Sequence, residues 1–303
     1  MTGFPAKAGG ALRSGADAVL TYGRMIRFSH TVFALPFALS AVVLAQRISP
    51  IAAADFFWIL AAMIGARSAA MGFNRIVDAR FDRDNPRTAG REIPSGRITL
   101  RSAVLFVVLS SALFVMAAAM LNMLCLALSA PVLLVLFGYS YTKRFTRWSH
   151  LYLGFAISLA PMGAWIALTG SFSWGILCLS LALMTYIAGF DIIYACQDVD
   201  FDRKQNLFSV PAHYGATGAL RIAVGLHMLS FGFFWLVYLF FDMGWIYLVT
   251  VIIIGGLFIL EHRLVRGGDL KHIELAFFHV NSVISVVLFF GVLADEWMMR
   301  WMM

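Results

Sequence analysis

Two acid-rich segments of this chain carry the same residue pattern 120 positions apart. Asn74, Asp78 and Asp82 follow one another at intervals of four, and Asp198 and Asp202 repeat the last two positions. Phe-Asp-Arg recurs at the same offset, and both segments lie where an apolar run ends. Agreement of this kind indicates one function carried out by two matched parts of the fold.

The spacing of these acids suits a divalent cation. Side chains four residues apart lie on one side of a helix, so each segment would gather its carboxylates on a helical extension. Neighbouring carboxylates repel one another unless a cation lies between them. Hard oxygen ligands supplied one or two at a time suit Mg²⁺, which takes its other ligands from water and phosphate. We therefore predict a magnesium site for a diphosphate, with ligands Asn74, Asp78, Asp82, Asp198 and Asp202. The alternative is a set of solvated acids that only balance nearby arginines, which explains a single acidic loop better than a matched pair.

Basic residues follow both acidic segments. Arg87 and Arg91 lie in the loop after the first segment, and Arg203 and Lys204 end the second. A planar guanidinium can form two parallel hydrogen bonds with phosphate oxygens, so these residues could bind a departing diphosphate. A topological explanation stays open, because any cytoplasmic loop of a membrane protein collects Arg and Lys.

The elements that position these segments must be membrane helices. Hydrophobic residues make up 61% of the 303 residues and charged residues 13%, against about 45–50% and about 25% in soluble domains. This composition excludes a soluble enzyme, and basic residues that only interrupt apolar runs argue against nucleic-acid binding. The three cysteines have neither disulfide nor zinc-ligand spacing.

We predict an all-α polytopic membrane protein, a bundle of nine transmembrane helices around a central cavity open to the cytoplasmic side. The predicted spans are 27–46, 55–76, 102–121, 123–142, 151–169, 173–194, 218–241, 243–262 and 274–294.

The loops predict the topology. The runs 102–121 and 123–142 are almost continuous, and one helix of that length would measure about 60 Å, twice the hydrocarbon thickness. We therefore predict a turn at Asn122 and not a single helix kinked at Pro131. Twenty of the 23 Lys and Arg residues lie in the N-terminal segment and in the loops of one side. The positive-inside rule then puts the N-terminus in the cytoplasm and the C-terminus outside a prokaryotic cytoplasmic membrane. Residues 1–26 are predicted to be a cytoplasmic segment and residues 27–303 a single transmembrane domain.

The two acidic motifs, Asn-x-x-x-Asp-x-x-x-Asp at 74–82 and Asp-x-x-x-Asp at 198–202, resemble those of the UbiA superfamily of intramembrane prenyltransferases. Similar sequences also carry Tyr-x-x-x-Lys-Arg, present here as Tyr139, Lys143 and Arg144. The resemblance covers nearly the whole chain. It implies magnesium-dependent transfer of a polyprenyl group from its diphosphate to an acceptor, with Lys143 near the diphosphate. The segment 27–37 resembles the branch that prenylates 4-hydroxybenzoate, or its naphthoate-using relatives, which implies a place in ubiquinone or menaquinone biosynthesis.

Two charged residues inside predicted spans suit the acceptor of such a reaction. Asp191 lies seven residues before Asp198, on nearly the same helix face and about 10 Å deeper. We predict that it is the catalytic base that removes a proton from the alkylated ring. Arg67 lies seven residues before Asn74 and could bind a substrate carboxylate, with Lys143 as the weaker candidate. An ionisable group inside a span is by default a functional candidate, and the alternative is a structural ion pair between Arg67 and Asp191.

Further acceptor contacts are predicted from helix faces and from the resemblance. His30 lies three residues after Arg27, and Tyr194 three residues after Asp191, so each shares a face with a charged residue. Together with Arg27 and Tyr139 they are candidate contacts of the acceptor, although a lone His or Tyr on a helix is more often a core residue. The rival class is a transporter with a midplane Arg and Asp site. The acids argue against it, because they cluster at helix ends.

Overall fold

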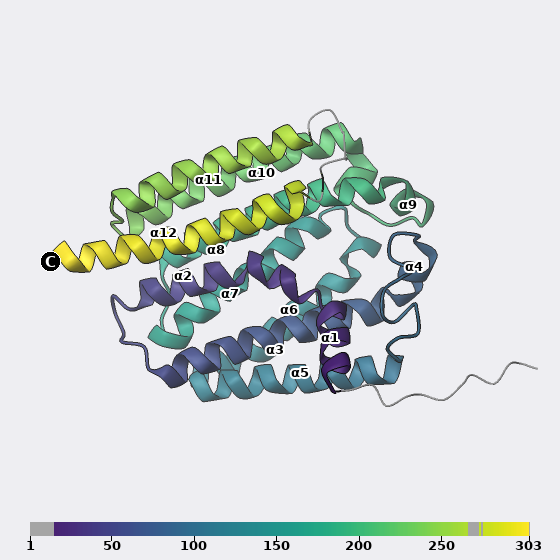
Figure 1. The fold of residues 1–303 in the computed structure, drawn as a ribbon, viewed down its shortest axis with the longest axis horizontal. Helices are drawn as coiled ribbons and strands as arrows, with labels where there is room; N and C mark the ends of the chain where they lie inside the picture. The colour runs from purple at the N-terminus through teal and green to yellow at the C-terminus, as the bar shows by residue number, and fades with distance from the viewer. Residues whose placement is uncertain (1–14, 266–272, 274, 303) are drawn as a thin grey trace, which may run out of the picture.

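The computed structural model describes residues 15–265, 273 and 275–302, and the regular elements in these ranges are helical (Figure 1). Parts of three predicted segments lie outside the described residues: 1–14 of the N-terminal segment, 266–272 of the last basic loop, and 274 at the start of the last span. The long helices are α3 Ala53–Val77, α5 Leu100–Leu121, α6 Met123–Gly138, α7 Ser149–Thr169, α8 Trp174–Ala195, α10 Val210–Phe240, α11 Trp245–Leu264 and α12 Asn281–Met302. The short ones are α1 Gly15–Met25, η1 Phe28–Phe33, α2 Leu35–Ala45, α4 Ala79–Asp84, η2 Tyr139–Arg144, η3 Cys196–Asp198, α9 Val199–Lys204 and η5 Leu275–Val280.

Eight helical segments in the described ranges are long and apolar enough to cross a bilayer. The predicted span 27–46 differs from the others, because it consists of the short helices η1 and α2. Arg27, just before η1, has a left-handed backbone with φ 47°. The two helices meet at Ala34, and Pro36 lies in the first turn of α2, where its missing N–H needs no helical partner. Together η1 and α2 would measure about 28 Å end to end, close to the hydrocarbon thickness of about 30 Å. A ninth crossing at this place stays a prediction.

The predicted turn at Asn122 is confirmed. Helix α5 ends at Leu121 and α6 begins at Met123, and Asn122 between them is extended, with φ −164° and ψ 168°. Its side-chain oxygen accepts a hydrogen bond of 2.8 Å from the backbone N–H of Cys125, which caps α6. Its amide nitrogen donates to the carbonyl of Ile166 on α7 at 3.0 Å. The Asn122 side chain therefore stabilises the turn between α5 and α6 and binds this turn to α7.

Helix α8 lies at the centre of the bundle. Most of its side chains are buried, and it packs against α7 on one side and α10 on the other (Figure 1). Helices α5, α6 and α11 instead expose many large apolar side chains, as lipid-facing helices do. Small residues allow close packing: a Cβ at Gly65 of α3 would lie 2.8 Å from the backbone nitrogen of Phe114 on α5.

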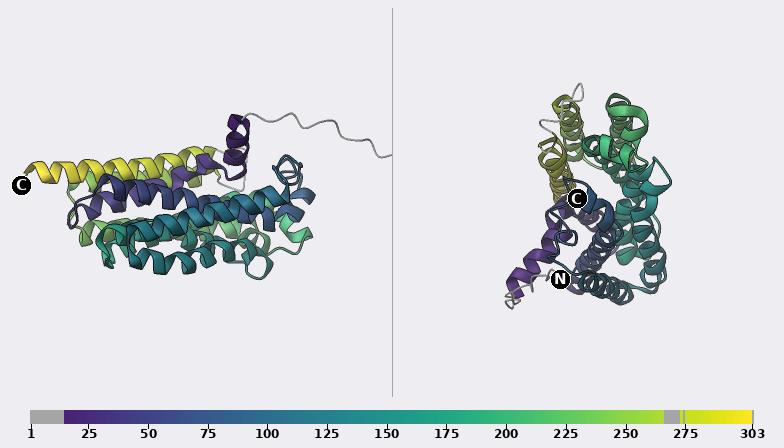
Figure 2. Two further views of the ribbon diagram at one scale, coloured as in Figure 1. Left: turned by 90° about the horizontal axis from the view of Figure 1, so that it is seen from below. Right: turned by 90° about the vertical axis from the view of Figure 1, so that its right-hand side faces the viewer.

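The short helices α4 and α9 lie at one end of the bundle, and the C-terminus of α12 lies at the opposite end (Figures 1 and 2). The two helices span residues exactly matched in the repeat, 79–84 and 199–204. Each is preceded by an Asp outside the helical region, Asp78 with φ −89° and ψ 1° and Asp198 with φ −104° and ψ 7°. The helical extensions predicted for the two segments are present but interrupted: α3 ends at Val77 and α8 at Ala195, and α4 and α9 follow as short separate helices. Asp is a weak helix former, which accounts for the interruption at Asp78.

Candidate active site

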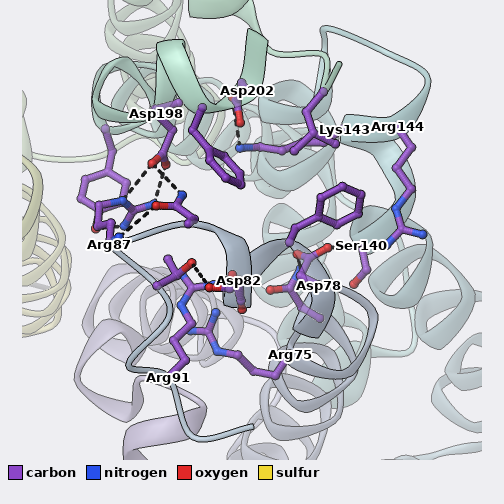
Figure 3. A pocket seen from close by; sticks show the side chains of 18 of the residues that line it. Arg75, Asp78, Asp82, Arg87, Arg91, Ser140, Lys143, Arg144, Asp198 and Asp202 are labelled. Carbon is purple, nitrogen blue, oxygen red and sulfur yellow. Dashed lines mark hydrogen bonds and ion pairs between the residues drawn. The ribbon is translucent and has the colours of Figure 1, made fainter. Parts of the chain in front are cut away.

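A cavity of about 180 Å³ lies between the two acid-rich segments. Both segments, the loop after α4, and η2 contribute to its walls (Figure 3). The predicted site residues that line it are Asn74, Asp78, Asp82, Arg87, Arg91, Tyr139, Lys143, Asp191, Tyr194, Asp198 and Asp202. Segments about 120 residues apart in the sequence therefore meet around one space.

Asp82 and Asp202 occupy matched places in this cavity and have matched surroundings. Both side chains are buried. Arg91 donates from Nη1 to Oδ1 of Asp82 at 2.6 Å, and Lys143 Nζ lies 3.7 Å from Oδ2 of Asp202. The Oδ2 atom of each acid is buried and accepts no hydrogen bond within the described residues. A buried carboxylate oxygen without a donor is costly, so these two oxygens fit the ligands of a cation.

Asp78 lies between an amide and a guanidinium. Asn74 donates from Nδ2 to its Oδ2 at 2.8 Å, and Arg144 Nη2 lies 3.8 Å from its Oδ1. Burial and the negative charge of Asp82 raise the pKa of Asp78 to about 6. A bound cation would favour its ionised form. No three His, Cys, Asp or Glu side chains in the described ranges lie close enough together to hold a metal ion by themselves, so a cation here would also take oxygens of water or phosphate, as Mg²⁺ usually does.

Asp198 is held by the loop after α4. Arg87 donates to both of its oxygens, from Nε to Oδ1 at 2.9 Å and from Nη2 to Oδ2. The amide of Asn85 donates to Oδ1 at 3.4 Å. Arg87 also donates from Nη1 to the hydroxyl of Tyr194 at 3.1 Å, and its guanidinium lies 5.3 Å from the centre of that ring. The fork geometry needed for phosphate is present at the cavity, with Asp198 as its partner (Figure 3).

Asp191 of α8 lines the cavity about two helical turns before Asp198. Its side-chain partner is His150 of α7. The two side chains are joined by a hydrogen bond of 2.7 Å between His150 Nδ1 and Asp191 Oδ2. The alternative of an ion pair between Asp191 and Arg67 is therefore wrong for this structure. Arg67 donates from Nη2 to the carbonyl of Arg27 at 3.0 Å, and its buried Nε has no acceptor among the described residues.

Five predicted site residues lie outside the cavity lining. Arg203 and Lys204 are exposed, and Arg203 Nε donates to the carbonyl of Ala212 at 2.9 Å. The other three are Arg27, His30 and Arg67. The ring of His30 lies against the rings of Phe33, Phe277 and Phe278, with centroids 5.3–5.5 Å apart.

Several residues of the site were not predicted from the sequence, above all His150 and Asn85. A signal for His150 was present, because Arg-Phe-Ser-His at 27–30 recurs as Arg-Trp-Ser-His at 147–150, again 120 positions later. The internal repeat therefore extends beyond the two acidic motifs. Asn85 lies next to the first motif, but sequence alone does not show that it reaches the second.

Comparison with known sequences and structures decides the family. The sequence model of the UbiA prenyltransferase family matches residues 34–283. This chain belongs to the UbiA prenyltransferase family. It is therefore a prenyltransferase homologue of the membrane and not a transporter.

Among related members of the UbiA family, the 4-hydroxybenzoate octaprenyltransferase of Vibrio campbellii is 30% identical over 232 residues, 76% of this chain and 81% of that protein. The enzyme of the same name from Citrobacter koseri is 31% identical over 244 residues, 77% and 82% of the two chains. The apo structure of a UbiA homolog from Aeropyrum pernix has a TM-score of 0.80 and 33% identity, covering 88% of this chain and 98% of that one. A UbiA homolog from Archaeoglobus fulgidus, bound to DMAPP and Mg²⁺, has a TM-score of 0.73 and 19% identity, with coverages of 91% and 99%. The all-helical fold is thus shared with this family.

Proposed function

We propose that this chain transfers a polyprenyl group from polyprenyl diphosphate to an aromatic acid, with 4-hydroxybenzoate as the preferred acceptor, in quinone biosynthesis. One observation carries the proposal: two matched acidic segments and the arginines beside them line a single cavity. Relatives about 30% identical are named 4-hydroxybenzoate octaprenyltransferase, which supports the choice of acceptor.

We assign Mg²⁺ to the acidic residues of the cavity. The Oδ2 atoms of Asp82 and Asp202 accept no hydrogen bond within the described residues, which supports this assignment, and so does the fold shared with a homolog bound to DMAPP and Mg²⁺. The remaining ligands would come from Asn74, Asp78 and Asp198. When bound, Mg²⁺ would neutralise charge that develops on the leaving diphosphate.

The basic side chains of the cavity would bind the diphosphate itself. Arg87 and Arg91 now hold the carboxylates of Asp198 and Asp82. Once those acids bind a cation, both guanidiniums can turn to phosphate oxygens without leaving the cavity. Lys143 would add a third positive charge. As the carbon–oxygen bond of the donor breaks, its electron pair goes to the diphosphate, and these preorganised charges stabilise the transition state.

The acceptor would lie deeper, beside Asp191. The allyl cation forms a bond with an electron-rich ring carbon, and Asp191 then takes the proton of that carbon so that the ring regains its aromaticity. Arg67 would bind the carboxylate of the acceptor, since its Nε has no partner among the described residues and the carbonyl of Arg27 uses only one Nη2 hydrogen. We also assign acceptor contacts to His30, Tyr139 and Tyr194.

We place this cavity on the cytoplasmic side of the membrane. The basic segments 75–101 and 143–147 lie at the end of the bundle that carries α4 and α9, where the positive-inside rule puts the cytoplasm. The water-soluble acceptor and the released diphosphate would then exchange directly with the cytoplasm.

The test uses membranes that contain this protein and a radiolabelled polyprenyl diphosphate. We expect Mg²⁺-dependent transfer of the label to 4-hydroxybenzoate within a panel of aromatic acids, and loss of transfer when the metal is chelated. Transfer only to a hydroxynaphthoate would move the chain to the other quinone route. If no aromatic acid of the panel is prenylated, the proposal is wrong.

A further inference from the structure

His150 is a buried histidine whose one side-chain partner in the described ranges is Asp191. Only 1% of its side chain is exposed, against 20% for Asp191. Its Nδ1 lies 2.7 Å from Oδ2 of Asp191, and its buried Nε2 has no hydrogen-bond partner among the described residues. The histidine is thus buried and does not line the cavity, whereas the acid that it contacts does.

The packing of α7 against α8 fixes this pair. Gly154 lies one turn after His150, and a Cβ at this position would collide with the backbone carbonyl of Met184. The two helices are consecutive and antiparallel, so moving one turn back along α7 corresponds to moving further along α8, toward Asp191. The glycine allows the backbones to approach closely, and this approach brings Nδ1 of His150 within hydrogen-bond distance of Asp191.

The surroundings of His150 favour one tautomer of its ring. The buried Nε2 has no hydrogen-bond partner among the described residues, so the neutral tautomer that leaves no buried N–H unpaired carries its hydrogen on Nδ1. Nδ1 then donates the hydrogen bond to Oδ2 of Asp191. His150 therefore keeps Oδ2 of Asp191 occupied and leaves Oδ1 to accept a proton.

The repeat provides an internal comparison. His30 occupies the position of His150 in the first half of the chain, and Met71 occupies the position of Asp191. His30 accordingly lies among the rings of Phe33 and Phe277, with no acid at the matched position. A histidine is present in both halves, but only the second half gives it a carboxylate.

We propose that His150 is a positioning residue of the prenyl transfer, which orients the Asp191 carboxylate for removal of the ring proton. In this step Oδ1 of Asp191 gains the proton, and the electron pair of the broken carbon–hydrogen bond restores the aromatic ring. His150 keeps its own proton and donates through it to Oδ2 throughout. The inference rests on the proposed aromatic prenyl transfer.

The test measures turnover and a kinetic isotope effect in His150→Leu and His150→Asn. Loss of the donor in His150→Leu should lower kcat at least about tenfold, a part of the 10²–10⁴-fold that a positioned base contributes, while KM for the prenyl diphosphate stays the same. Proton removal should then become rate-limiting, so an acceptor deuterated at the reacting ring carbon should show a primary isotope effect larger than in the wild type. Asn can place an amide N–H where Nδ1–H was, so His150→Asn should recover most of the lost turnover.

His227→Leu is the matched control. His227 is also fully buried, but it lies on α10, pairs with His262 at 3.0 Å, and does not line the cavity. The His227→Leu variant should show the wild-type isotope effect. If His150→Leu lowers kcat without a larger isotope effect, or if His150→Asn is as slow as His150→Leu, the positioning role is wrong. If wild-type protein fails to prenylate any aromatic acid, the proposed function fails instead. Should His150→Leu not fold in detergent, His150→Met takes its place as the variant without a donor, with the same expected loss of turnover and the same larger isotope effect.

Discussion

The first acid-rich segment, around Asp78 and Asp82, and the second, around Asp198 and Asp202, have nearly the same backbone. Each begins at an Asp with ψ near 0° and continues into a six-residue helix. Each buries its second acid with one oxygen that has no donor in the described ranges. The metal-binding chemistry we propose therefore uses both halves of the repeat in the same way.

The two segments differ in the residues around this shared backbone. Asp78 is bonded by Asn74 of its own segment, whereas Asp198 is bonded by Arg87 from the loop of the other half. Seven residues before the first acid the chain has Met71 in one half and Asp191 in the other. In our proposal the repeated segments thus supply matched acids for the metal and the prenyl diphosphate. Residues that differ between the two halves, such as Asp191, serve the aromatic acceptor.

The largest effects should come from the matched acids. Asp82→Asn and Asp202→Asn each remove one ligand charge from a buried position, and loss of several kcal/mol at a metal-assisted step corresponds to about a 10³-fold drop in kcat/KM. The measurement is Mg²⁺-dependent transfer by purified variants in detergent.

The exposed neighbours Asp84 and Asp200 provide controls, since neither lines the cavity. Asp84→Asn and Asp200→Asn should keep wild-type activity. If Asp82→Asn proves harmless while Asp202→Asn is inactive, the two segments are not equivalent and the symmetric metal site is wrong.

Asp191→Asn should have the next largest effect, because it removes the group that the first half lacks. We expect about a 10²-fold loss of turnover, as for removal of a general base, with little change in KM for the prenyl diphosphate. Steady-state kinetics with each substrate varied separately provide the check. A collapse of donor binding with turnover spared would assign Asp191 to the diphosphate site.

Sequence patterns predicted most of the fold and part of the site, for identifiable reasons. Spans such as 173–194, found as α8 Trp174–Ala195, follow from length and hydropathy, which are local properties. The first span was harder, because it begins at a left-handed Arg27 and consists of two short helices that meet at Ala34, just before Pro36 in the first turn of the second. His150 reaches Asp191 through the register of two packed helices, which no local pattern contains. Arg203 follows Asp202 directly, but successive side chains on a helix point about 100° apart, so only the acid faces the cavity.

A more modest effect should separate the two arginines of the loop. Arg87 gives Asp198 two hydrogen bonds, while Arg91 gives Asp82 one. Arg87→Ala should raise KM for the prenyl diphosphate about tenfold, the value of one charge-assisted hydrogen bond. Because it also frees Asp198, Mn²⁺ added without diphosphate should bind more tightly than in the wild type.

Mn²⁺ binding followed by electron paramagnetic resonance measures this second effect directly. Arg91→Ala should change metal affinity in the same direction but by less. Weaker Mn²⁺ binding in Arg87→Ala would mean that the arginine supports the metal site and does not compete with the metal for Asp198.

The smallest effect concerns Arg67, which we assign to the carboxylate of the acceptor. An arginine inside a span costs at least about 2.5 kcal/mol on insertion scales, so it should have an anionic partner, and Asp191 is bonded to His150 instead. Lys keeps the charge but loses the planar fork. Arg67→Lys should therefore raise KM for the aromatic acid about fivefold, roughly 1 kcal/mol for one lost hydrogen bond, and leave KM for the prenyl diphosphate unchanged.

The same phenol without its carboxylate is the comparison compound for Arg67. Wild-type protein should use it poorly, and Arg67→Lys should use it no worse than wild type does, because the lost hydrogen bond has no partner there. Equal use of both phenols by the wild type would show that Arg67 serves the structure through its bond to the Arg27 carbonyl. In that case Asp191 of the second half would be the charged acceptor contact that remains, and the difference between the two halves would be sharper than we propose.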